Sequence, residues 1–128
     1  LTLIVLCIVL YIIWWAKKFQ RTKQVKISSE FRKKIHTHIE QLSSKPLDRR
    51  IIEYDKVLDK ILEEKWYHGT LADMMRIHSS QFLDENRIWS AHKIRNKIVH
   101  AIGFSPSPNV LRTHIGVFQK EIQFLLKK

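Results

Sequence analysis

The residues best suited to chemistry lie in one short stretch, WSAHKIRNKIVH, which runs from Trp89 to His100. Arg95 supplies a permanent cation, Asn96 an amide, and His100 an imidazole, the side chain most often used as a general acid or base. At helical spacing His92, Asn96 and His100 form one row, because each lies four residues from the next. One helix would therefore present a cation, an amide and an imidazole around one end.

Arg95 also occupies a position where a core residue is expected. Ile88, Ala91, Ile98 and Ile102 share its stripe at helical period, which is the pattern of a buried helix face. A guanidinium cannot lose its charge, so burying one without a partner costs several kcal/mol or more. Arg95 is therefore predicted to have an acidic partner or to line a functional cleft.

The matching anomaly is a carboxylate in another apolar stripe. Asp55 interrupts the apolar face of the helix predicted over 47–66. A buried carboxylate and a buried guanidinium satisfy one another best as a charge-assisted pair. We therefore predict that Asp55 and Arg95 face each other across the bundle, with Asp59, one turn on, as the reserve partner.

The order Arg95, Asn96, three further residues and His100 resembles the signature of the HEPN superfamily, an Arg and a nearby His with a polar residue directly after the Arg. Domains of that superfamily are small helical bundles, and many are metal-independent RNases or partners of minimal nucleotidyltransferases. The resemblance covers roughly Ser44 to Lys128 and does not include the N-terminus. It implies an endoribonuclease or RNA-binding module that needs no cofactor and forms a homodimer.

The resemblance also implies roles for individual residues. The RNA's own 2′-hydroxyl would be the nucleophile, with His100 as general acid or base and Arg95 stabilising charge on the phosphate. Asn96 would orient the histidine or a phosphate oxygen. Lys93 and Lys97 would contact the RNA backbone. Asp55 and His92 are assigned supporting roles.

Two other functions fit the same residues. In a non-catalytic, membrane-tethered interaction or dimerisation module, Asp55, Arg95 and His100 would form only a structural polar network. In the toxin component of a toxin and antitoxin pair, they would cleave RNA under the control of a partner. Trp89, at the start of the stretch, is predicted to anchor the core rather than to stack on bases.

Composition restricts the remaining choices. The net charge of the 128 residues is +11, but the stretch from Lys17 to Lys34 holds eight basic residues against Glu30 alone and so contributes most of it. The rest of the chain is only mildly basic, which suits a weak RNA binder at best. Cys7 is the single cysteine, so an intrachain disulfide is excluded. No residues have convincing metal-ligand spacing, and no metal site is expected.

The N-terminal stretch 1–16 is uncharged and is predicted to be a single-pass transmembrane anchor. The lack of an initiator Met suggests that the anchor begins before Leu1. Trp14 and Trp15 would lie at the membrane interface. The C-terminal domain would then be cytoplasmic, at the cell membrane. Anionic lipid would be contacted by four cations, Lys17, Lys18, Arg21 and Lys23.

The predicted fold class is all-α, a transmembrane helix followed by an antiparallel four- to five-helix bundle. Residues 17–43 form a basic juxtamembrane helix or stalk, and residues 44–128 form the bundle that resembles HEPN domains. Helix boundaries follow from turn and cap residues. They predict helices over 47–66, over a short segment after Thr70, and over about 85–102 and 109–126.

Overall fold

A computed structural model of the chain describes residues 1–21, 26–66 and 69–128, and every regular element in those ranges is helical. Only three glycines and three prolines interrupt a sequence rich in good helix formers. The elements are α1 (Thr2–Arg21), α2 (Ser29–Leu42), α3 (Leu47–Trp66), α4 (Leu71–Ile77), the 3₁₀ turn η1 (Ser79–Gln81), α5 (Glu85–His100) and α6 (Pro108–Lys127). The predicted all-α class is therefore confirmed for the described residues.

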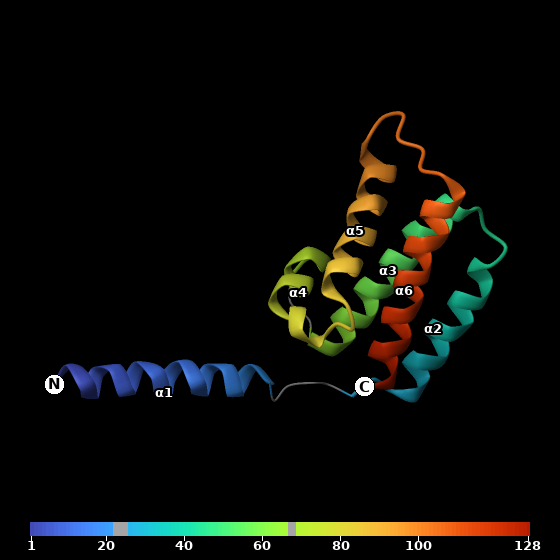
Figure 1. The fold of residues 1–128 in the computed structure, drawn as a ribbon. Coiled ribbons are helices and arrows are strands. Elements are labelled where there is room, and N and C mark those ends of the chain that lie inside the picture. The colour runs from blue at the N-terminus through green and yellow to red at the C-terminus, as the bar shows by residue number, and fades with distance from the viewer. Residues whose placement is uncertain (22–25, 67–68) are drawn as a thin grey trace.

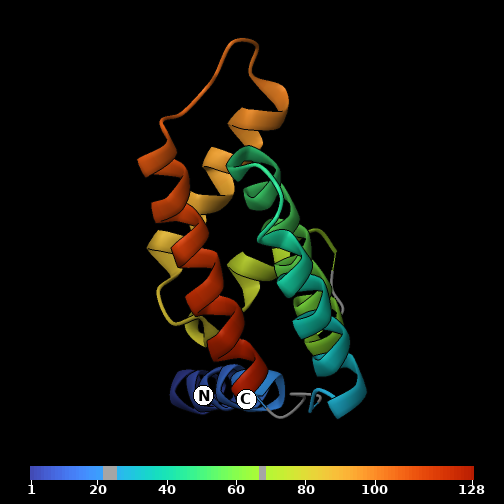
Figure 2. The ribbon, with the colours of Figure 1, turned by 90° about the vertical axis from the view of Figure 1, so that its right-hand side faces the viewer.

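Helix α3 is the centre of the bundle. It packs along α6 and also contacts α2, α4 and α5, while α5 lies against α6 (Figures 1 and 2). The apolar faces of these helices meet in one core, whose fully buried members include Ile51, Leu58, Leu62, Phe118 and Leu125. Since α3 and α5 are held against the same core, residues on their facing stripes can reach one another.

The helix starts follow the cap residues in the sequence. Thr70 and Asp73 form a capping box at the start of α4, directly after Gly69, which has a φ of 67°. The side chain of Asp84 accepts a hydrogen bond at the start of α5, and that of Ser107 does so at the start of α6. The helix starts predicted after Thr70 and at about residue 85 are confirmed.

Helix α5 ends two residues earlier than predicted. Ala101 adopts an extended backbone (φ −88°, ψ 120°), so the chain leaves the helix before Ile102. Ile102 is consequently fully exposed, and its place on the buried stripe was predicted wrongly. Gly103 has a φ of 76° and turns the chain toward α6, where Val110 is also exposed.

The prediction of a transmembrane anchor over residues 1–16 is wrong. Helix α1 has twenty residues, but its uncharged part ends at Ala16 because Lys17 follows. Within the described ranges, none of the helices is long and apolar enough to span a membrane. The predicted single-pass placement at the cell membrane, with a cytoplasmic C-terminal domain, is not supported.

The basic segment 17–43 contains parts of two helices. Helix α1 continues to Arg21, and α2 begins after Ser28, whose side chain accepts a hydrogen bond from the N–H of Phe31 at 3.2 Å. Ile27 and the buried face of α2 belong to the core, so this half docks on the bundle. Lys23, one of the four predicted lipid contacts, lies outside the described residues, and lipid contact by the other three stays a prediction.

Candidate functional site

Helices α3 and α5 bring a carboxylate, an imidazole and a guanidinium together. Asp55 on α3 is buried, and its Oδ1 lies 2.8 Å from Nδ1 of His92 on α5. Its Oδ2 lies 3.3 Å from Nε of Arg95. The predicted contact between Asp55 and Arg95 is therefore present, but the closer contact of the carboxylate is with His92.

Asn96 closes this group into a ring. Its Oδ1 accepts a hydrogen bond from Nη1 of Arg95 at 2.9 Å, and its Nδ2 lies 3.2 Å from Nε2 of His92. His92 and Asn96 are i and i+4 on α5, so their side chains meet on one face of the helix. Asp55, His92, Asn96 and Arg95 thus form a closed polar ring, named so below.

The polar ring determines which nitrogen of His92 carries a proton. A guanidinium only donates, so the amide oxygen of Asn96 must face Arg95. The amide NH₂ then faces Nε2 of His92, which must accept. Nδ1 therefore carries the proton and donates it to Asp55. Such a carboxylate contact fixes both the tautomer and the ring orientation of a histidine.

The polar ring reaches solvent at Arg95. The side chain of Arg95 is 21% exposed, against 5% for Asp55. Its buried Nε faces the carboxylate without the alignment of a hydrogen bond, so that contact is an ion pair. Nη2 makes no hydrogen bond to any described residue. An edge of the guanidinium is thus free to bind a ligand.

His100 lies outside the polar ring. It is the exposed last residue of α5, and within the described ranges it makes no hydrogen bond or ion pair with a ring side chain. Arg95 and His100 are five residues apart, which places them about 140° from one another around a helix. The structure therefore brings together four of the five residues assigned catalytic or supporting roles, and leaves His100 at the adjacent helix end.

The other predicted site residues lie around this helix. Lys93 and Lys97 are both exposed on α5, and Nζ of Lys97 lies 5.7 Å from the ring centroid of Phe104. Trp89 is half-buried against the core, as predicted, and meets the ring of His92 edge-on at 6.1 Å between centroids. The reserve residue Asp59 pairs with no described cation of α5, and burial raises its pKa, with Glu63 and Asp55 adding to the effect.

The burial of Glu121 was not predicted. Glu121 on α6 is only 2% exposed, and it accepts hydrogen bonds from the N–H groups of Leu83 at 2.8 Å and Asp84 at 3.4 Å. Burial raises its pKa, although these two donors act in the opposite direction. Glu121 lies on the buried stripe with Phe118 and Ile122, so the rule that identified Asp55 would also have identified it.

Comparison with known proteins adds no relative. No family model, no curated protein and no solved structure matches the chain. The resemblance to the HEPN superfamily therefore depends on Arg95, Asn96 and His100 and stays a prediction. Within the described ranges, no three His, Cys, Asp or Glu side chains are grouped so that they could hold a metal ion.

Proposed function

We propose that the bundle binds RNA at the polar ring and cleaves it as a metal-independent endoribonuclease. The observation that supports this is the state of Arg95. Asp55 and Asn96 hold its guanidinium in one orientation, while part of the side chain stays open to solvent. A guanidinium held in place beforehand can donate two hydrogen bonds to a phosphate without reorganising as charge develops.

In the proposed reaction the 2′-hydroxyl of RNA attacks the adjacent phosphorus. A base takes the hydroxyl proton, an acid protonates the leaving 5′-oxygen, and the products are a 2′,3′-cyclic phosphate and a free 5′-hydroxyl. His100 is exposed and is assigned to proton transfer. A homodimer would supply a second His100 for the second proton transfer. Lys93 and Lys97 would contact the RNA backbone.

The geometry changes the role proposed for Asn96. Its amide is bonded to Arg95 and His92 and not to His100. Asn96 would therefore position the guanidinium rather than the general acid or base. Asp55 and His92 would act through the same contacts, as positioning residues that touch no substrate.

The test is a cleavage assay of the full chain on mixed single-stranded RNA in the presence of EDTA. His100→Ala should lower the rate by about 10²-fold or more, the usual loss when a general acid or base is removed. Arg95→Lys should fold normally yet lose most activity, because a point charge cannot replace the planar fork. His36→Ala, which changes an exposed histidine on α2, is the matched control and should cleave normally.

A non-catalytic interaction or dimerisation module is the second candidate. The closure of the polar ring on itself favours it. Two exposed apolar side chains also favour it: Val99 in the last turn of α5 is 45% exposed, and Ile102 just after the helix is 105% exposed. Absence of cleavage by the native chain would favour this candidate over the RNase. The toxin alternative needs the same cleavage and would be excluded by the same result.

A further inference from the structure

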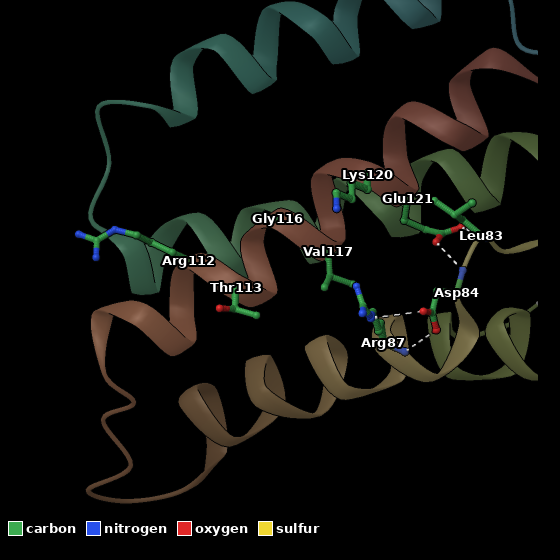
Figure 3. A pocket seen from close by; sticks show the side chains of 9 residues that line it. All are labelled: Leu83, Asp84, Arg87, Arg112, Thr113, Gly116, Val117, Lys120 and Glu121. Atoms are coloured by element: carbon green, nitrogen blue, oxygen red, sulfur yellow. Dashed lines mark hydrogen bonds and ion pairs between the residues drawn. The ribbon is translucent and has the colours of Figure 1, made fainter.

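A hollow of about 510 Å³ lies between the start of α5 and the exposed side of α6 (Figure 3). This volume is within the range of small-molecule sites. Arg87 is its main residue from α5, and Arg87 and Asn96, nine residues apart, lie on opposite sides of a helix. The hollow is therefore separate from the polar ring, and it is named the α5–α6 pocket here.

The α5–α6 pocket has both acidic and basic side chains at one end and, at the other, a cation without a nearby acid among the lining residues. Asp84 and Glu121 are at one end, where Glu121 holds the backbone N–H groups of Leu83 and Asp84. Arg112 is nine residues before Glu121 on α6, or about 13 Å along the helix, and marks the other end. Figure 3 shows Arg112 extended outward there.

The two carboxylates already have partners. Asp84 accepts the N–H of Arg87 at 3.1 Å as the cap of α5, and its other oxygen lies 3.4 Å from Nε of Arg87. The cations of α6 are less engaged. Arg112 has one long contact, 3.4 Å to Asn109, and Lys120 has no ion pair with any described residue. Unneutralised positive charge is thus concentrated on α6.

Gly116 keeps the middle of the pocket open. It lies on α6 midway between Arg112 and Lys120, and a Cβ built on it would meet no atom within 4 Å. Thr113 and Val117 line the same face, so the pocket offers a hydroxyl near the cationic end and an apolar wall. A ligand that fits must combine an anionic end with a flat or apolar part.

We propose that the α5–α6 pocket binds a nucleotide. The phosphate would lie toward Arg112 and Thr113, because cations and hydroxyls are the usual phosphate donors. The sugar and base would lie across Gly116, where the carboxylate of Asp84 can accept from hydroxyl or amino groups. The nucleotide could be free or part of an RNA strand. The proposal does not depend on cleavage at the polar ring.

Isothermal titration of the full chain with adenosine monophosphate, adenosine and inorganic phosphate tests this. The monophosphate should bind more tightly than either fragment. Arg112→Ala should weaken its binding by about tenfold, as expected when a charged hydrogen-bond donor is lost. Lys127→Ala, which removes an exposed lysine of α6 outside the pocket, is the matched control and should bind like the native chain.

Gly116→Leu is the decisive variant. Its side chain enters open space and raises helix propensity, so the fold should be kept while the pocket is filled. Loss of binding in this variant supports the proposal. Unchanged binding by Gly116→Leu would overturn it, as would equal affinity for inorganic phosphate and the monophosphate, or no binding of the monophosphate at all.

Competition identifies the source of the nucleotide. If adenosine monophosphate displaces a short 5′-phosphorylated oligoribonucleotide from the native chain but not from Gly116→Leu, the pocket accepts a nucleotide of an RNA strand. If the oligoribonucleotide does not compete for a bound monophosphate, the pocket is restricted to free nucleotides. Failure of the RNase proposal would show in the Arg95 and His100 variants, which leave this pocket unchanged.

Discussion

Asp55 illustrates how much one buried carboxylate can organise. It accepts from His92, faces Arg95, and through both of them orients Asn96. Removing either of its two partners leaves it one contact, whereas removing Asp55 leaves Nδ1–H of His92 without an acceptor and Arg95 without its ion-pair partner. Substitution of Asp55 should therefore affect the ring more than substitution of any other member.

We expect Asp55→Ala to lower the free energy of unfolding by about 3 kcal/mol, the lower end of what breaking a buried ion pair costs. The lower end applies because the side chain of Arg95 is partly exposed. Urea denaturation followed by circular dichroism measures this. Glu64→Ala, which changes an exposed acid of the same helix, should change stability by no more than about 0.5 kcal/mol.

The double variant Asp55→Leu with Arg95→Met should recover only part of this loss. It removes both charges of the ion pair, but His92 still loses the acceptor of its Nδ1–H. An Asp55→Ala protein as stable as the native chain would refute the account of the ring as a buried network.

Among the elements, α5 depends on α6 for the position of its start. Glu121 of α6 holds the two backbone N–H groups that precede α5, across 38 and 37 residues of sequence. The same contact forms the acidic end of the α5–α6 pocket. The ionisation of this one side chain should therefore influence how firmly α5 is seated.

Stability should show a pH dependence that comes from Glu121. Burial raises the pKa of this carboxyl above its ordinary value of 4.5. The folded state then binds more protons than the unfolded state between the two pKa values. The contribution of Glu121 to stability is therefore complete below pH 4.5, and it is lost as the pH rises through the pKa of Glu121 in the folded state.

The side chain of Glu121→Gln cannot titrate, so this variant should not lose the stability that Glu121 contributes at low pH. The urea midpoints of the native chain and of Glu121→Gln are measured from about pH 4 to about pH 8. The difference between the two curves gives the contribution of Glu121, because the other titrating groups are the same in both proteins. The native chain should lose stability relative to the variant as the pH rises. Two curves that run parallel over the whole range would show that Glu121 does not titrate with a raised pKa.

The whole molecule consists of a helical bundle and of helix α1, whose described side chains lie outside the core of the bundle. The core contains residues from Ile27 to Leu126, and no described residue of α1 belongs to it. The large apolar side chains of α1 are exposed, and Figure 1 shows this helix extending away from the bundle. The stability of the bundle should therefore not depend on α1.

We expect a chain that begins at Lys26 to unfold within a few degrees of the full chain, since it keeps the entire core. Within it, Ile27→Ala should cost about 2–5 kcal/mol, as for other buried isoleucines. Ile77→Ala, at a side chain that is 59% exposed, is the control and should be nearly neutral. A large drop in melting temperature on removal of residues 1–25 would show that α1 stabilises the bundle.

Much of the fold is readable from local sequence. Helix period and cap residues predicted α3 at 47–66 correctly, along with the starts of α4 and α5, because caps and apolar stripes act within a few residues. The end of α5 was missed because Ala101 and Ile102 carry no stop signal of their own. The transmembrane anchor was predicted from the uncharged stretch 1–16, with Trp14 and Trp15 beside the cations that begin at Lys17, and that prediction was wrong.

The candidate site, too, could be predicted from the sequence only in part. A charge in an apolar stripe is visible in the sequence, so the pairing of Asp55 with Arg95 could be predicted from the sequence alone. Three other features depend on how α3, α5 and α6 are rotated against one another. Asp55 lies closer to His92 than to Arg95, His100 stays outside the polar ring, and a pocket opens at Gly116. Those rotations are set by packing between residues more than thirty positions apart, which no local pattern encodes.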